Sequence, residues 1–365
     1  MNILITNFHL KDGGGHRTYI KYIFQHLNSE NLSIYLAAPS SSKLNKDCKE
    51  IFRSRVFDIE FPAKLSELFR MMRSIFQIRK ILLNKNINIV HVNGSPDHKV
   101  IALIRWIYGL KFKILRTKHD SSLIKTSFIH KKIFHEYTDY LILVSNFQLA
   151  NISDNFIRNK SLVIQNGIDI NHFKSIPRSD KLSKKYSLKM DDLVFISTAG
   201  TAPHKGWNFL LDAIERLNPD AVKKIKVFIL GNKPEEQVLK KHESKNIFFP
   251  GLIQDVRDYV SLADVGFVLS YRVETISYAC REMMSMGIPV IVSSYAGLPE
   301  NIDIEKNGWV VDTDNLEEIT KLINSLTRKN LEKFSINARK KAVDEFDIKK
   351  KNEQLKQIYY SLMSN

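Results

Sequence analysis

Cysteine, long apolar runs and a leader peptide are scarce or missing in this sequence, and each absence narrows its class. The 365 residues include two cysteines, Cys48 and Cys280, and no Cys-x-x-Cys motif. This pattern provides neither a disulfide framework nor a zinc site, so a reducing compartment is expected. No stretch approaches the ~18 apolar residues that span a bilayer. Because the N-terminus also lacks a basic leader with a long apolar core, we expect a cytoplasmic protein.

Acidic residues are few in the first half of the chain. Residues 1–175 carry 26 Lys and Arg against 13 Asp and Glu, whereas the remainder carries 29 against 26. Most of the net charge of +16 therefore lies in the first half. Such asymmetry favours an anionic partner, either nucleic acid or an anionic membrane at the inner face of the cell. A solvated basic face without a partner is the alternative.

Two common nucleotide fingerprints are incomplete or absent. Asp12-Gly13-Gly14-Gly15-His16 lies between a predicted strand and helix but is not G-x-G-x-x-G. The second strand ends in Leu36-Ala37-Ala38, without an acid for a ribose, so a nicotinamide site is disfavoured. A phosphate-binding G-x-x-x-x-G-K-[ST] loop is also missing. The consecutive glycines still allow close backbone approach to a ligand, with helix N–H groups available to an anion.

Apolar runs of strand length alternate with helical patterns in two series. A polar stretch at 172–192 separates them and predicts a linker. This alternation predicts an α/β fold with two parallel-sheet domains, which suits a chain of this length. A final helix at 348–363 follows after the second domain is complete. The predicted strands lie at 2–6, 33–38, 87–92, 112–116, 140–144, 162–164, 193–197, 225–230, 246–249, 265–269, 290–292 and 309–311.

Two glutamates eight positions apart carry the strongest functional signal. Glu274 follows an apolar strand, and Glu282 lies within a helix predicted at 276–286. Open α/β sheets bind ligands at the carboxyl ends of strands. With a helix start near Thr275, Glu282 lies about two turns along, roughly 10 Å away. That separation is long for an acid/base pair, so we expect the carboxylates to bind hydroxyl groups of an extended ligand, with its phosphates on the helix N–H groups.

Two further polar residues follow predicted strands. His119 comes after the fourth strand and can exchange hydrogen bonds with a sugar or leaving group near neutral pH. Lys205 lies in Gly200–Trp207, where a helix begins, and its charge suits a phosphate. A loop histidine with its own partners and a surface lysine are the alternatives.

The motifs together resemble the donor-site signature of retaining GT-B glycosyltransferases of family 4. The match rests on the two glutamates, Met283-x-x-Met286-Gly287-x-Pro289, Gly297-Leu-Pro-Glu300, and, earlier in the chain, Gly13–Gly15, Val144–Asn146, Asn166–Asp169 and His204–Gly206. The resemblance implies two Rossmann-like domains facing a cleft, with the final helix crossing back to the first domain. It places an acceptor-side domain at 1–175 plus 346–365 and a donor domain at 176–345.

The resemblance also implies roles for individual residues. Glu282 would hold the donor ribose, Glu274 the donor sugar, and Lys205 with the backbone of Thr275, Ile276 and Ser277 the diphosphate. Gly14 and Gly15 would face the phosphates, and His119 the sugar beside its anomeric carbon. The catalytic set is thus His119, Glu274 and Lys205, without a metal, a cofactor or an assigned protein nucleophile. The donor is a nucleotide-diphosphate sugar, and the acceptor is a hydroxyl of a cell-surface glycan or glycolipid, such as lipopolysaccharide or a lipid-linked saccharide.

The sequence departs from the family pattern in two places. The glycine-rich continuation after the first glutamate is here Glu274-Thr-Ile-Ser277. An arginine common before the lysine is replaced by Ala199 and Gly200. We expect Arg17 or Arg272 to supply the missing phosphate or acceptor contact.

A basic amphipathic helix at 64–83 provides a candidate membrane contact, although it also suits packing on its own sheet. Two other functions stay open. One is a sugar-nucleotide epimerase of the same architecture, which would convert the donor without an acceptor. The other is a non-catalytic basic protein that binds RNA. Because no RNA-binding module is evident, we expect a nucleotide sugar and an acceptor as partners, and no nucleic acid.

Overall fold

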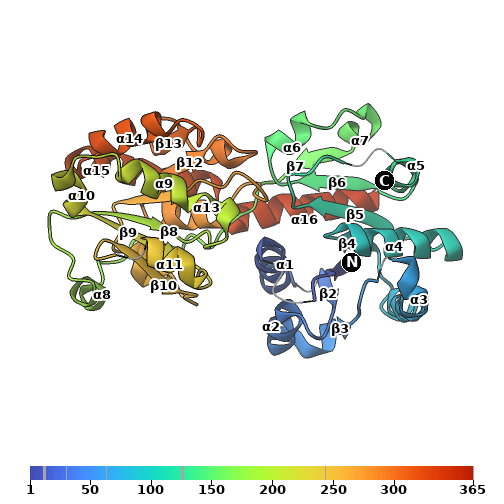
Figure 1. Ribbon diagram of the computed structural model, residues 1–365. Coiled ribbons are helices and arrows are strands. Elements are labelled where there is room, and N and C mark those ends of the chain that lie inside the picture. The colour runs from blue at the N-terminus through green and yellow to red at the C-terminus, as the bar shows by residue number, and fades with distance from the viewer. Residues whose placement is uncertain (11–13, 30, 63, 125–126, 243, 365) are drawn as a thin grey trace. The chain divides into compact units, whose positions relative to one another are not determined.

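The computed structural model describes all residues except 11–13, 30, 63, 125–126, 243 and 365 (Figure 1). It consists of two compact units. Unit 1 comprises Met1–Gly167 and Ile348–Asn365, and unit 2 comprises Ile168–Asp347. The division falls at Gly167, before the predicted linker. That stretch belongs to unit 2, because it forms helix α8 (Asp180–Lys185), whose Leu182 is buried in the unit's core.

Unit 1 is built on a parallel sheet which, among the described residues, has seven strands in the order β3-β2-β1-β4-β5-β6-β7. The order reverses between β1 and β4, which is the switch point where open α/β sheets bind ligands. The short edge strand β3 was not predicted. The strands are β1 (Asn2–Thr6), β2 (Ser33–Ala38), β3 (Val56–Asp58), β4 (Ile89–Val92), β5 (Lys113–Lys118), β6 (Tyr140–Leu143) and β7 (Ser161–Val163).

Helices cover both faces of this sheet. Val90 and Val92 of β4 share a core with Ile78 of α3 and Ile101 of α4. His91, which alternates with these valines, instead hydrogen-bonds Tyr359 of α16, so α16 lies on the opposite face. Figure 1 shows α16 running beside the strands of unit 1. The helices are α1 (Gly15–His26), α2 (Lys43–Phe52), α3 (Leu68–Asn84), α4 (Ser95–Tyr108), α5 (Phe128–Glu136), α6 (Asn146–Ala150), α7 (Asn155–Asn159) and α16 (Ile348–Ser364).

Unit 2 repeats the architecture with a parallel sheet in the order β10-β9-β8-β11-β12-β13. Its switch point lies between β8 and β11. The strands are apolar on both faces, as buried parallel strands are: Val194 and Ile196 of β8 enter one core and Phe195 the other. The strands are β8 (Leu193–Ser197), β9 (Ile225–Leu230), β10 (Ile247–Gly251), β11 (Val265–Val268), β12 (Val290–Ser293) and β13 (Gly308–Val311).

The helices of unit 2 are short from α8 to α13 and longer at α14 and α15. They are α9 (Trp207–Ile214), α10 (Pro219–Lys224), α11 (Glu236–His242), α12 (Arg257–Val260), α13 (Tyr278–Ser285), α14 (Leu316–Ser325) and α15 (Arg328–Glu345), in addition to α8. A membrane-spanning helix, judged by length and apolar character, is not found in the described part of either unit.

Candidate active site

Lys205 and Glu274 meet at the switch point of unit 2. Lys205 closes a 3-10 turn after β8, and Glu274 lies in the loop after β11. The Lys205 Nζ is 2.9 Å from the Glu274 Oε2, and the two side chains are only 18% and 15% exposed. The structure thus joins two residues that are 69 positions apart and were predicted separately. A ligand phosphate arriving here meets a lysine already oriented by a carboxylate.

Gly206 explains how the two loops approach so closely. Its φ is +67°, and a Cβ at this position would lie 1.9 Å from the backbone oxygen of Leu269, at the end of β11. The His204 carbonyl also accepts a hydrogen bond from the Tyr271 N–H, at 3.1 Å. Only glycine permits this contact, so the His-Lys-Gly sequence fixes the lysine beside the β11 loop.

The loop from Val273 to Ser277 contains two residues with unfavourable backbone angles. Val273 has φ +53° and Ser277 has φ +55°. Ser277 caps α13, and its Oγ accepts a hydrogen bond from the Cys280 N–H. A serine therefore occupies a conformation that favours glycine, at the position where the family pattern has one. Such strain costs on the order of 1–3 kcal/mol and is typical of functional loops.

Helix α13 begins at Tyr278 rather than near Thr275, which corrects the predicted geometry. Because the chain from Glu274 to Ser277 forms the strained loop, Glu282 is only the fifth helical residue, about 6 Å along the axis at 1.5 Å per residue. Its half-buried carboxylate has no side-chain partner within the described part of the chain. Burial raises the pKa of Glu282 to about 7. A ligand hydroxyl would satisfy this desolvated acceptor.

The other residues predicted around the diphosphate differ in accessibility. Thr275, Ile276 and Ser277 are all buried side chains. The Thr275 N–H already donates to the Glu274 Oε1 at 3.3 Å, so the loop organises its own carboxylate before any ligand binds. Arg272 is exposed, with its guanidinium 5.9 Å from the centre of the Tyr271 ring.

Sequence reasoning missed Arg281, the largest fully buried side chain of the protein's described part. Its Nε donates to the Asn301 Oδ1 at 2.8 Å, and its guanidinium lies 4.2 Å from the centre of the Phe346 ring. Asn301 in turn donates to the carbonyl of Ile276 at 2.8 Å. Burial lowers the pKa of Arg281 to about 10, so it stays charged at neutral pH. This network fixes the β11 loop to α13. The only sequence signal for Arg281 was a charged residue among the apolar positions of the helix.

In unit 1, His119 follows β5 on the same face of the sheet as His91 and Thr117. Its Nε2 is 2.9 Å from the Asn93 Oδ1. The Asn93 amide nitrogen is occupied by the carbonyls of Thr6 and His91, at 3.1 and 3.3 Å, which fixes the amide orientation. His119 Nε2 therefore donates. Burial and neighbouring histidines hold the pKa of His119 well below its ordinary value, so the ring is neutral.

A buried hydrogen-bond chain connects α16 to Tyr19, whose ring contacts His119. The Tyr359 hydroxyl is 2.7 Å from the His91 Nδ1, and the His91 Nε2 is 2.7 Å from the Thr117 Oγ1. The Thr117 Oγ1 is 3.1 Å from the Tyr19 hydroxyl, and the Tyr19 ring lies 4.8 Å from that of His119. No local motif signals this chain, because its members come from four distant segments.

The remaining predicted residues of unit 1 lie at the start of α1. Gly14 is the N-cap with φ +51°, and Gly15 opens the helix. Asp12 and Gly13 lie outside the described residues. Arg17 donates to the Asp47 Oδ2 through Nε at 2.9 Å and Nη2 at 2.6 Å, so it would have to leave this partner to bind a phosphate.

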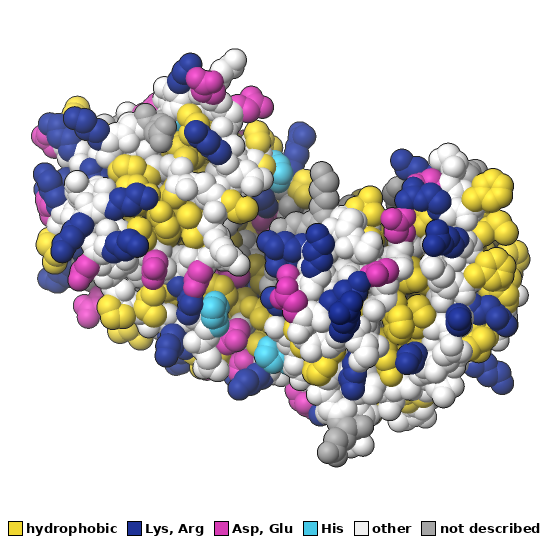
Figure 2. All heavy atoms as spheres, turned by 90° about the horizontal axis from the view of Figure 1, so that it is seen from below, with side chains coloured by type: hydrophobic (Ala, Val, Ile, Leu, Met, Phe, Trp, Pro, Cys, Tyr) yellow, Lys and Arg dark blue, Asp and Glu magenta, His cyan; other side chains and the backbone are white. Residues whose placement is uncertain are grey.

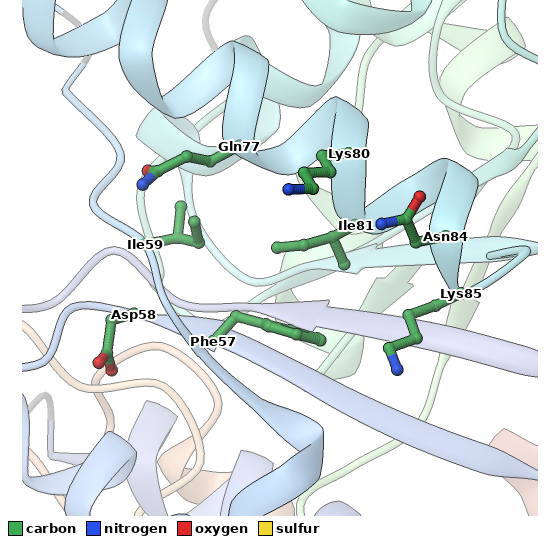
Figure 3. A pocket seen from close by; sticks show the side chains of 8 residues that line it. All are labelled: Phe57, Asp58, Ile59, Gln77, Lys80, Ile81, Asn84 and Lys85. Atoms are coloured by element: carbon green, nitrogen blue, oxygen red, sulfur yellow. The ribbon is translucent and has the colours of Figure 1, made fainter.

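A separate hollow of about 410 Å³ lies at the far edge of the unit 1 sheet, between β3 and α3 (Figure 3). Its lining includes Asp58, Gln77, Lys80, Asn84 and Lys85. Because β3 is the outermost strand, this hollow is removed from the switch point, and it contains none of the predicted site residues.

Comparison with known proteins identifies the chain. A family described as "Glycosyl transferases group 1" matches residues 178–341, and one described as "Glycosyltransferase Family 4" matches residues 13–172. The protein is a glycosyltransferase. An uncharacterized glycosyltransferase of Methanocaldococcus jannaschii is 23% identical over 99% of this chain and 98% of its own length.

Two further relatives are informative. The Escherichia coli UDP-Gal:alpha-D-GlcNAc-diphosphoundecaprenol alpha-1,3-galactosyltransferase is 24% identical over 94% of this chain and 92% of its own length. The crystal structure of Anabaena HepE in complex with UDP superposes with a TM-score of 0.81 at 19% identity, covering 99% of this chain and 100% of that one. The GT-B fold predicted from the sequence, with two parallel-sheet α/β domains, is thereby confirmed.

Proposed function

We propose that the protein is a retaining, metal-independent glycosyltransferase that moves a sugar from a nucleotide-diphosphate donor to a hydroxyl of a cell-surface glycan or glycolipid. The observation that carries this proposal is the Lys205–Glu274 pair at the switch point of unit 2, followed on α13 by Glu282, whose carboxylate has no side-chain partner among the described residues. HepE has been crystallised with UDP and with UDP-glucose, which supports a nucleotide-sugar donor. The E. coli relative is named for a diphosphoundecaprenol-linked acceptor, which supports a lipid-linked saccharide.

Each predicted site residue of unit 2 has a chemical role in this proposal. The Glu282 carboxylate accepts hydrogen bonds from the two ribose hydroxyls. This charge-assisted interaction satisfies its desolvated oxygens. Glu274 accepts hydrogen bonds from hydroxyls of the donor sugar and keeps Lys205 in position. Lys205 and the first N–H groups of α13 contact the diphosphate.

Transfer breaks the bond between the anomeric carbon and the diphosphate oxygen and forms a bond from the acceptor oxygen to the same carbon. Negative charge grows on the departing oxygen, and Lys205 with the helix N-terminus stabilises it. The acceptor proton leaves with the diphosphate. His119, held neutral with hydrogen on Nε2, contributes a hydrogen-bonding ring beside the anomeric carbon rather than a charge. No protein carboxylate is assigned as a nucleophile.

The proposal extends to an anionic membrane, because unit 1 exposes hydrophobic and basic side chains together. Ile75, Ile78, Ile81 and Leu82 of α3 are buried against the sheet, so this part of the predicted membrane helix is core. The opposite face of α3 is exposed. Hydrophobic and basic side chains are intermingled on the surface seen in Figure 2. Exposed side chains on α3, α4 and α5 include Phe69, Met72, Phe76, Trp106, Phe128 and Ile129 with Arg73, Lys80 and Lys131.

An apolar hollow of about 320 Å³ between α4 and α5 belongs to this surface. Trp106 and Phe128 line it, 64% and 81% exposed, with Lys99 and Lys132 beside them. Aromatic rings next to lysines suit the interface of an anionic bilayer. Trp106→Glu combined with Phe128→Glu should abolish co-sedimentation with phosphatidylglycerol vesicles at low salt, whereas Met190→Glu in unit 2 should not. Equal binding by all three proteins would contradict the membrane contact.

A thermal-shift panel of UDP, GDP, ADP, dTDP and CMP sugars identifies the donor class, since a bound ligand raises the melting temperature by mass action. The donor that binds is then incubated with and without lipid-linked saccharides. Glu282→Ala should weaken donor binding, and His119→Ala should lower kcat. Full turnover by both variants would refute the site. Conversion of the donor to its epimer without an acceptor would instead support an epimerase, and NMR of the product linkage tests retention.

A further inference from the structure

Several polar side-chain atoms after the end of β1 and at the start of α1 are buried without a partner in the described part of unit 1. They are the His9 Nε2, the His16 Nδ1 and both amide atoms of Asn7. Asn7 directly follows β1, and His16 lies in the first turn of α1, so all come from the switch-point edge of the sheet. Buried polar groups normally have a partner, and those left without one point to a missing water or ligand.

The rings of three histidines are in contact. The His9 and His16 ring centres are 4.6 Å apart, and those of His16 and His119 are 4.3 Å apart. The Tyr19 ring also contacts His119, with the ring centres 4.8 Å apart. The described residues contain no set of His, Cys, Asp or Glu side chains arranged to hold a metal ion.

This histidine cluster (His9, His16 and His119) is uncharged at neutral pH. Burial, together with the neighbouring His9 and Arg116 and opposed by Asp120, lowers the pKa of His16 to about 3. Burial likewise lowers the pKa of His9. A neutral imidazole donates one hydrogen bond and accepts another, but it cannot balance the charge of a phosphate. The cluster therefore suits an uncharged, hydroxyl-rich group.

We propose that His9 Nε2 and His16 Nδ1 hydrogen-bond hydroxyl groups of a sugar ring that lies against His119. The proposal rests on the glycosyltransferase function above and adds two residues, from the β1 end and the start of α1, to which the sequence motifs gave no role. The sugar belongs either to the donor or to the acceptor, and both present the same hydroxyl chemistry.

The test compares His9→Ala and His16→Ala with His26→Ala, an exposed histidine of the same helix α1. Affinity is measured for UDP and for UDP-glucose, or for the nucleotide pair that the donor panel selects, and donor hydrolysis and transfer are assayed separately. If the donor sugar is bound, the sugar nucleotide should bind about five-fold more weakly to each variant while the free diphosphate binds normally. If the acceptor sugar is bound, only the acceptor KM should rise. His16→Asn should restore part of the loss.

Two results separate failure of this subsite from failure of the proposed function. A wild-type protein that transfers no sugar from the panel refutes the function. The subsite is then read from ¹⁵N NMR of the imidazole nitrogens, where millimolar glucose, galactose or mannose should shift the His9 and His16 signals. The subsite is refuted if neither hexose nor sugar nucleotide shifts these signals, or if an active enzyme keeps both alanine variants within two-fold of His26→Ala in every assay.

Discussion

Glu282→Gln should make the ligand-free protein more stable at alkaline pH while weakening its hold on the donor. The carboxylate lacks a side-chain partner among the residues that the structure describes, and burial raises its pKa from 4.5 to about 7. The folded protein therefore binds this proton more tightly than the unfolded chain does. Between pH 4.5 and 7 the folded state keeps the proton that the unfolded state loses, so stability falls as pH rises through this window.

The size of the effect follows from the shift. About 2.5 pKa units at 1.36 kcal/mol each correspond to about 3 kcal/mol of stability lost above pH 7, an upper value for a half-buried group. Glutamine is nearly isosteric and cannot ionise, so it avoids this loss. The variant should match the wild type near pH 4.5 and exceed it by up to about 3 kcal/mol at pH 8, or several degrees in Tm for a unit of this size.

Urea unfolding of both proteins from pH 4.5 to 8 measures the difference directly. Glu332→Gln, on the exposed surface of α15, is the matched control and should show no such pH-dependent gain. In parallel, calorimetry with the selected donor should show affinity increasing from pH 6 to 8 in the wild type, because the ribose binds the ionised carboxylate. Glu282→Gln should bind the donor more weakly and without this pH dependence. Equal stability of Glu282→Gln and wild type at pH 8 would show that the carboxylate is not desolvated.

Three other predictions test the local structure. Gly206→Ala should destabilise unit 2 by about 3 kcal/mol or more in urea, because of its backbone angle and the clash with Leu269, whereas Gly109→Ala, with φ +58° but no atom within 4 Å of the new Cβ, should cost only about 1 kcal/mol. Ser277→Gly should be at least as stable as the wild type, since relief of strain offsets the lost cap, but Ser277→Ala should be about 1 kcal/mol less stable; the reverse order would contradict the strain. Tyr359→Phe leaves the His91 Nδ1 without its partner and should cost about 1–3 kcal/mol, with a lower kcat if the buried chain positions His119.

Local sequence patterns predicted most of the strands and helices, although they missed β3 and placed the start of α13 too early. Runs such as Val265–Val268 and Val290–Ser293 read as buried parallel strands because they are apolar at every position. Once the strands were placed, His119 and Lys205 followed as strand-end residues, since polar groups after a parallel strand lie at the binding edge. The consecutive glycines after the first strand likewise predicted a close backbone approach, and Gly14 has a positive φ.

Tertiary structure alone decided which site residues are charged and which partners they have. The ion pair of Lys205 with Glu274, the buried Arg281 and the neutral histidines all depend on distance and desolvation between segments far apart in the chain. Glu282 shows the difference: the sequence placed it on a helix near a strand end, but only burial in the folded unit could raise its pKa and leave it without a partner. Coulombic attraction and loss of water act through space, so no local pattern of residues records them.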